Sequence, residues 1–446
     1  MLVAIYSGDI NRETEVKGMK NFKGIFQNAN YVKLFFANFT SQMGSTIGLT
    51  AFMFYLLDRF SEQPFYATLT ELMFSVPTLA VFFLVGVFAD RMDRQKIAYH
   101  CDWISALLSF VLLLTIIIGW MPLVFTVLFL RSAIQKFFFP AEHAMIQGIL
   151  KSEDYTTAAG LNQVVMSLFM LFGNGLGIFA YWSVGVYGAI VADALTFIIS
   201  ALLIKSCRIP EEVRLPNGAH GLKDLNIPLV FKDFNLGIKY ILQHKLLSAL
   251  LVGFFVFGVV NGGFSVMPIF MLKYKLEPQS YEEYSVLLGI TFGIGVLIGS
   301  FVASLLTQKF KLYQLVITGL LLSGSFIIAA SFAENTFIFL SLLFAAAFGL
   351  PLVNIAIGGW MPSIVDPKMM GRVQGWISPL MMLSQSITLG FIAVSFPGFL
   401  KVEMLYWMVG GCLALVGVFY SLVLPGLTKK SEKTGEAHSL EQTDAV

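Results

Sequence analysis

The sequence carries little charge for its length. Asp, Glu, Lys and Arg make up 13% of its 446 residues, whereas 57% are hydrophobic. Soluble domains contain about 25% charged residues, because their surface has to face water. So small a charged fraction excludes a soluble protein. The net charge of +2 also lacks the basic excess of a nucleic-acid-binding protein, so no nucleic-acid partner is expected.

Residues typical of metal centres, disulfides and enzyme sites are also scarce. The chain has three cysteines and five histidines, and Cys101, Cys207 and Cys412 lie far apart. This spacing favours free thiols, so we expect no bound metal, no disulfide framework and no cofactor. No G-x-x-x-x-G-K-[ST] loop occurs, which argues against an ATP-driven pump. No nucleophile–base set indicates an enzyme. His143 and Asn354, which lie 211 positions apart, are polar residues at corresponding places of two similar sequence segments, but they form no such set.

A cleavable signal peptide is not visible either. The first 18 residues include charged side chains such as Asp9 and Arg12 and lack an apolar core. A basic stretch follows Met19, so Met1 and Met19 are both candidate starts.

Long apolar segments, in contrast, are abundant. A helix needs about 20 apolar residues to cross a bilayer. We therefore predict an all-α integral membrane protein with twelve transmembrane helices, at residues 34–57, 67–89, 98–118, 122–142, 157–181, 187–205, 247–272, 284–307, 312–332, 336–360, 373–395 and 404–424. An even number of spans leaves both termini on one side. With both termini inside, 23 of the 29 Lys and Arg residues are cytoplasmic, which predicts a multi-pass plasma-membrane protein in that orientation.

One long polar stretch, residues 206–246, divides the spans into two groups of six. We predict an N-terminal six-helix bundle at 31–205 and a C-terminal one at 247–424, joined by this central cytoplasmic loop. A cytoplasmic segment, 1–30, precedes the first bundle. The polar tail, 425–446, is expected to be disordered.

The two halves are related in sequence. At a constant offset of 211 residues, Pro140 matches Pro351 and Gly148 matches Gly359, within a longer run of such matches. Two parallel repeats with a substrate site at their interface, near the middle of the bilayer, are an architecture of secondary transporters.

The loop after the second span carries a recognisable motif. It reads Gly86-Val-Phe-Ala-Asp90-Arg91-Met-Asp93-Arg94-Gln-Lys96. This resembles the G-x-x-x-D-R-x-G-R-K signature of the major facilitator superfamily, and its D-R-x-D-R form resembles the macrolide-efflux-type subgroup. Gly371-Arg372-Val373, before the eleventh span, resembles a G-R-V found in the same subgroup. The resemblance implies the major facilitator fold, with two pseudo-symmetric six-helix halves.

The chemistry of the motif suits a gate. Gly86 and Asp90 lie one helical turn apart, so the bare glycine backbone permits close helix packing beside the carboxylate. Asp90 can accept hydrogen bonds from arginines of the loop or from a helix N-terminus, which would lock the inner ends of the two halves. The alternative is an ordinary basic cytoplasmic loop. The predicted gating residues are Gly86, Asp90, Arg91, Asp93, Arg94, Lys96, Gly371 and Arg372.

Charged groups inside a span are costly, and they are functional candidates for that reason. Arg131 lies in the fourth span, in Leu130-Arg131-Ser-Ala-Ile-Gln135, which resembles an R-x-x-x-G/Q motif of the superfamily. A guanidinium at this depth needs a carboxylate or several carbonyls. It could favour ionisation of a nearby acid and so help release a proton, or it could simply brace the helices.

Three acidic residues complete the proton-coupling candidates. Glu71 either carries a proton or lies hydrated at the headgroups, and Asp193 either carries a proton or braces its helix. Asp193 begins an Asp-Ala-Leu-Thr-Phe stretch that resembles the subgroup. Asp102 is expected to be the structural partner of an arginine. The arginines considered are Arg91, Arg94 and Arg131.

The substrate surface is expected in the first and seventh spans, which are pseudo-equivalent. Aromatic and methionine side chains there suit bulky amphipathic or cationic ligands, although most of the 43 phenylalanines are expected to face lipid or other helices. The predicted cavity residues are Phe36, Phe39, Gln42, Met43, Phe254, Phe257, Asn261 and Phe264.

The resemblance implies a secondary active transporter that works without a cofactor. We expect a monomer that exports amphipathic drugs, such as macrolide-like compounds, by alternating access driven by a proton gradient. The alternatives are a uniporter or importer of a metabolite and a transport-dead membrane sensor. They stay open because Asn174 replaces the proline of the G-x-x-x-G-P signature typical of antiporters.

Overall fold

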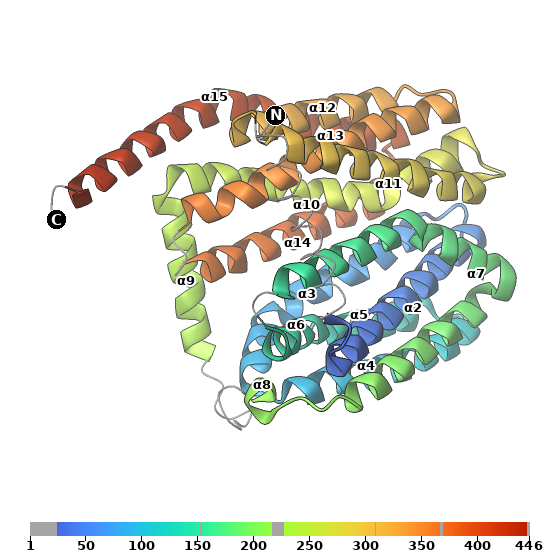
Figure 1. The fold of residues 1–446 in the computed structure, drawn as a ribbon. Helices are drawn as coiled ribbons and strands as arrows, with labels where there is room; N and C mark the ends of the chain where they lie inside the picture. The colour runs from blue at the N-terminus through green and yellow to red at the C-terminus, as the bar shows by residue number, and fades with distance from the viewer. Residues whose placement is uncertain (1–24, 152–153, 216–226, 308, 366–368, 444–446) are drawn as a thin grey trace, which may run out of the picture. The chain divides into compact units, whose positions relative to one another are not determined.

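The computed structural model describes residues 25–151, 154–215, 227–307, 309–365 and 369–443. These residues form helices joined by short connections and contain no strand, so the all-α prediction is confirmed for this part of the chain (Figure 1). The backbone forms two compact units. The first comprises residues 1–55 and 80–225, and the second comprises residues 56–79 and 226–446. Two helices, α2 (Ala29–Arg59) and α3 (Phe65–Arg91), contribute residues to both units.

In the first unit, α4 (Arg94–Ile118) lies beside α7 (Tyr155–Lys205) and also packs against α5 (Met121–Gln135) and α6 (Phe138–Ile149) (Figure 1). A short helix, α8 (Glu211–Arg214), follows and contacts α6.

The second unit is built around α10 (Lys245–Met271). It packs against the long helices α14 (Met370–Ser395) and α15 (Val402–Thr443). The other elements are α9 (Ile227–Gln243), η3 (Leu272–Leu276), α11 (Tyr281–Leu306), α12 (Leu312–Ala330) and α13 (Thr336–Ile364). The helix α13 packs against both α11 and α12.

Local sequence explains where several helices begin and end. Asp93 precedes α4, and its Oδ1 accepts hydrogen bonds from the backbone N–H groups of Gln95 and Lys96, which caps the first turn. The same helix ends at Gly119, whose φ of 79° is the left-handed conformation that glycine adopts without a steric cost.

Ten helical segments of the described residues are long and apolar enough to cross a membrane. The predicted count of twelve differs from this for two reasons. The helix α2 is not among the ten, because polar uncharged residues interrupt its apolar sequence. The spans predicted at 157–181 and 187–205 are both helical parts of α7, and the backbone leaves helical geometry between them at Gly185, where φ is 66°, so the ten segments include one where two were predicted.

Two further boundaries differ from the predictions. The span predicted at 122–142 is divided into α5 and α6 by a break at Lys136 and Phe137. In the tail, α15 continues as helix through Thr443, over most of the segment that we expected to be disordered. The tail contains Lys, Glu, Ala and Gln, which are good helix formers and allow this extension.

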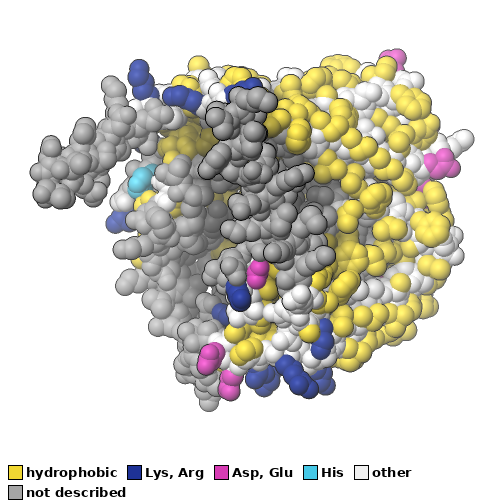
Figure 2. All heavy atoms as spheres, in the orientation of Figure 1, with side chains coloured by type: hydrophobic (Ala, Val, Ile, Leu, Met, Phe, Trp, Pro, Cys, Tyr) yellow, Lys and Arg dark blue, Asp and Glu magenta, His cyan; other side chains and the backbone are white. Residues whose placement is uncertain are grey.

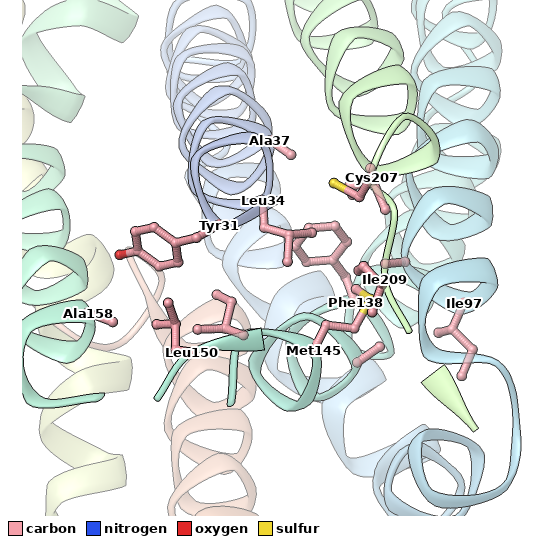
Figure 3. Packing of buried hydrophobic residues seen from close by; sticks show 14 of the residues in the cluster. Tyr31, Leu34, Ala37, Ile97, Phe138, Met145, Leu150, Ala158, Cys207 and Ile209 are labelled. Atoms are coloured by element: carbon pink, nitrogen blue, oxygen red, sulfur yellow. The ribbon is translucent and has the colours of Figure 1, made fainter. Parts of the chain in front are cut away.

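An apolar cluster closes one end of the first unit. Side chains from α2, α4, α6 and the segment after α7 converge there (Figure 3). Leu34, Phe138 and Met145 are among its fully buried members. On the outside, hydrophobic side chains cover much of the visible surface of the described residues, as expected of helices that face lipid (Figure 2).

Candidate functional site

The structure pairs Arg131 of α5 with Asp193 of α7. The Arg131 Nη2 atom lies 2.9 Å from both carboxylate oxygens of Asp193. The two side chains are 6% and 1% exposed, so the ion pair is almost completely removed from solvent. A buried guanidinium thus has the carboxylate that its burial requires.

Two serines and one aromatic ring complete the surroundings of this pair. Ser109 of α4 donates a hydrogen bond to Asp193 Oδ2 at 2.8 Å, and Arg131 Nη2 donates to Ser45 Oγ of α2 at 3.1 Å. The guanidinium carbon lies 5.1 Å from the centre of the Phe197 ring, a cation–π distance. The Nε atom of Arg131 has no hydrogen-bond partner in the part of the chain that the structure describes. The pair is therefore held from four helices, yet one donor stays available.

Small residues on α2 allow this close assembly. A Cβ atom at Gly44 would lie 1.8 Å from Thr196 Oγ1, and one at Gly48 would lie 3.0 Å from Asp193 Cβ. Only glycine fits at Gly44 without a shift of its neighbours. These contacts hold α2 against α7 at the level of the ion pair.

Asp102 forms a second buried polar group, nearby on α4. Ser200 Oγ donates to Asp102 Oδ2 at 2.5 Å, and Gln135 Nε2 donates to Oδ1 at 3.3 Å and to Ser105 Oγ at 2.8 Å. Of the three arginines considered as partners of Asp102, Arg131 pairs with Asp193 instead, and the side chain of Arg91 lies outside the described residues. Neutral donors bind Asp102 instead.

A third buried carboxylate, Glu142, was not among the residues predicted from the sequence. This residue is 1% exposed and lies on the same face of α6 as Phe138, Ala141 and Met145, which point into the apolar cluster. Asn38 of α2 donates a hydrogen bond to Glu142 Oε2 at 3.1 Å. The helical spacing of these apolar residues around one glutamate is a signal that could have identified it.

The part of the loop motif that the structure describes makes its contacts within the first unit. Asp93 Oδ2 lies 3.3 Å from Arg214 Nη1, and Arg94 Nη1 donates to the Val213 carbonyl at 3.2 Å, so the loop is tied to α8. Lys96 is exposed. The other predicted gating side chains lie outside the described residues: Gly86, Asp90, Arg91, Gly371 and Arg372. The lock between the two halves therefore stays a prediction.

Glu71 lies apart from the other carboxylates, on the part of α3 that belongs to the second unit. Its side chain is half-buried and forms no ion pair or hydrogen bond with another described residue. The structure therefore does not bring Glu71 together with Arg131 and Asp193.

The predicted cavity residues of α2 lie close together along the helix, in the first unit. Phe36 is 46% exposed, and Phe39 stacks on Phe169 with ring centres 5.5 Å apart. Gln42 and Met43 are half-buried. Exposed and half-buried aromatic groups of this kind can bind apolar ligands.

The corresponding residues of α10 lie in the second unit. Phe254 and Phe257 meet edge to face with ring centres 6.2 Å apart, and Phe264 lies 5.7 Å from the ring of Phe292. Asn261 is exposed. Since the α2 and α10 residues belong to different units, a shared cavity stays a prediction.

No group of three potential metal ligands occurs among the described residues. The buried polar side chains that the structure describes in the first unit are carboxylates, the Arg131 guanidinium and neutral hydrogen-bonding groups. Such a set can bind and release protons and can change partners when it does so.

Comparison with known proteins agrees with this fold. The profile of the Major Facilitator Superfamily matches residues 34–389. The MFS-type transporter YkuC of Bacillus subtilis (strain 168) is 50% identical over 402 residues, which cover 90% of this chain and 94% of the relative. Macrolide efflux protein A of Streptococcus pyogenes is 26% identical over 360 residues, covering 78% and 85% of the two chains.

Solved structures show the same fold at low sequence identity. The nucleoside transporter NupG matches with a TM-score of 0.66 and 11% identity over 89% of this chain and 98% of its own. A POT family transporter in complex with 5-aminolevulinic acid matches with a TM-score of 0.69 and 12% identity over 89% and 96% of the two chains. The family profile and the 50% identity to YkuC extend over most of the sequence. The chain is a multi-pass membrane transporter that belongs to the Major Facilitator Superfamily.

Proposed function

We propose that the protein is a proton-driven exporter of amphipathic compounds in the cell membrane, with both termini in the cytoplasm. The observation that carries the proposal is the buried pair of Arg131 and Asp193, held by Ser45 and Ser109. The 26% identity to macrolide efflux protein A supports macrolide-like compounds as the substrate class.

The pair offers a physical link between a proton and a change of conformation. A proton on Asp193 would remove the negative charge that compensates Arg131. An uncompensated buried cation costs about 3–5 kcal/mol, so the guanidinium would have to find other partners. Ser45 of α2 already accepts one hydrogen bond from it. Protonation would therefore change the contacts between α2, α5 and α7, and a small change there can shift the balance between inward-open and outward-open states.

Transport into inside-out membrane vesicles tests this proposal. The vesicles would receive an acidic interior, and uptake of a labelled macrolide and of a fluorescent amphipathic cation would be followed. Wild-type vesicles should accumulate at least one compound, and collapse of the gradient should abolish the accumulation. An exporter of another substrate class, or a sensor, would accumulate neither.

The variant Asp193→Asn separates coupling from substrate binding. Asparagine has nearly the shape of aspartate but cannot exchange a proton near neutral pH. It should lose gradient-driven accumulation while substrate exchange across the membrane without a gradient persists. Glu212→Gln, at an exposed position of α8, serves as the matched carboxylate control and should behave as wild type. Normal accumulation by Asp193→Asn would contradict the coupling role.

A further inference from the structure

The strongest unassigned feature of the first unit is the environment of Glu142. Its side chain lies among apolar residues of α6 and the surrounding cluster, and it forms no ion pair with any described Lys, Arg or His. It has one hydrogen bond, from Asn38 Nδ2 to Oε2. The second oxygen, Oε1, is buried and has no hydrogen-bond partner among the described residues. If Glu142 were ionised here, its buried negative charge would be stabilised by only one neutral hydrogen-bond donor.

The partner side chain shows the same deficit. The Oδ1 atom of Asn38 is also buried, and no described residue forms a hydrogen bond with it. The two unsatisfied atoms are both acceptors, and they belong to the two side chains that already share a hydrogen bond. One added proton on Glu142 Oε1 would supply the missing donor. The carboxylic acid and the amide could then form a reciprocal pair, in which each group donates once and accepts once.

Two titratable groups of neighbouring helices interact with Glu142. From α4, Asp102 interacts with it electrostatically, and from α2, the phenol of Tyr31 does so. Asp102 is another carboxyl group, so it supplies no positive charge, and the Tyr31 hydroxyl is buried without a hydrogen-bond partner among the described residues. Figure 3 shows Tyr31 at the edge of the apolar cluster that contains Phe138 and Met145. No element packed around this carboxylate supplies a described cation to it.

We propose that Glu142 and Asn38 form a proton-binding site, separate from the pair of Arg131 and Asp193. The ligand is a single proton, which is bound to Glu142 Oε1 and forms a hydrogen bond to Asn38 Oδ1. The site belongs to the closed apolar end of the first unit, so water entering that cluster would allow the proton to leave. The assignment concerns the folded protein and holds whatever compound the protein transports.

Infrared spectroscopy of the purified full-length protein tests the site directly. The difference spectrum between acidic and alkaline buffer contains the C=O band of each carboxylic acid that loses its proton. We expect Glu142→Gln to lose one such band, and Glu212→Gln, an exposed control, to lose a different one. Asn38→Ala should shift the Glu142 band, because the acid loses its amide partner. An unchanged difference spectrum in Glu142→Gln would overturn the proposal.

Two further experiments test the fold of the Glu142→Gln variant and a competing ligand. Glutamine offers an N–H donor and a carbonyl acceptor where the acid has its O–H and its carbonyl, so the Glu142→Gln protein should fold and melt at least as high as wild type. Failure of that variant to fold would refute the reciprocal pair. A metal cation is the competing occupant, since Oε1 and Oδ1 could both bind Na⁺. If NaCl raised the melting temperature of wild type more than choline chloride did, and not that of Glu142→Gln, the site would bind sodium instead.

Discussion

Asp58 accepts a hydrogen bond from the Tyr281 hydroxyl at 2.5 Å, although 223 positions separate the two residues in sequence. The same carboxylate lies 3.4 Å from Lys273 Nζ, and this ammonium lies 3.9 Å from the centre of the Tyr281 ring. The three side chains therefore contact one another pairwise. They connect the end of α2 with η3 and the start of α11 inside the second unit.

This triangle predicts a measurable loss of stability in Asp58→Ala. The side chain of Lys273 is 9% exposed, so the substitution would leave a largely buried cation without its carboxylate. Leaving such a group unsatisfied costs about 1–3 kcal/mol. The free energy of unfolding, measured by chemical denaturation in detergent, should fall by about this amount.

A neighbouring ion pair provides the control. Lys275 Nζ lies 3.0 Å from Glu403 Oε1, but both side chains are more than one quarter exposed, at 27% and 29%. Glu403→Gln should therefore cost about 1 kcal/mol or less. Equal losses in Asp58→Ala and Glu403→Gln would show that burial of Lys273 does not strengthen the first pair.

The pair of Arg131 and Asp193 predicts that a double substitution is milder than either single one. Arg131→Met or Asp193→Leu alone leaves one buried charge and should cost about 3–5 kcal/mol. The double variant leaves two apolar side chains of similar volume and should recover a large part of that loss. Denaturation curves of the four proteins give the coupling energy directly. If the stability loss of the double variant equalled the sum of the two single losses, the two residues would be energetically independent. The double variant should remain unable to couple transport to a proton gradient.

Helix boundaries were largely predictable because their signals are local. The prediction of 373–395 lies within α14, and that of 98–118 within α4, which begins at the Asp93 cap and ends before Gly119. An apolar run that is bounded by cap residues or charged residues can be recognised from the local sequence alone. The kink of α7 also falls at Gly185, inside the gap predicted between two spans.

The polar site was less predictable because it depends on contacts between distant segments. Arg131 and Asp193 were both selected as candidates, but nothing in the local sequence showed that they would pair across 62 positions. For the same reason Asp102 was assigned to an arginine, although Ser200, 98 positions away, donates to it. The break between α5 and α6 was likewise not visible, since apolar residues continue through it.

Burial predicts slow modification of Cys207, which follows α7. Desolvation raises the pKa of this thiol from 9.0 to about 11, and the charge of Lys33 opposes part of that rise. The thiolate is the reactive form, so maleimide should react slowly near neutral pH and faster as the pH approaches the pKa. The measurement is the labelling rate of a variant in which Cys101 and Cys412 are alanine. Lys33→Met should slow labelling further at each pH. A rate equal to that of the unfolded chain would contradict the burial of the thiol.

Gly44 predicts that one added methyl group will damage the site without touching a charged residue. A Cβ atom there would lie 1.8 Å from Thr196 Oγ1, so Gly44→Ala must push α2 away from α7. Overpacking of this kind costs about 1–3 kcal/mol. The shift would also lengthen the hydrogen bond from Arg131 to Ser45, which joins α2 to the ion pair.

The control for Gly44→Ala is Gly411→Ala on α15, because a Cβ atom at Gly411 has no neighbour within 4 Å. That substitution should leave the protein as stable as wild type or slightly more stable, since alanine favours helix over glycine by about 1 kcal/mol. Thr196→Ala removes the nearest obstructing atom, so it should restore part of the stability lost in Gly44→Ala. Thermal unfolding of the three variants measures these effects. If Gly44→Ala and Gly411→Ala behaved alike, α2 and α7 would not pack as closely as the structure shows, and the enclosed position of Arg131 would lose its explanation.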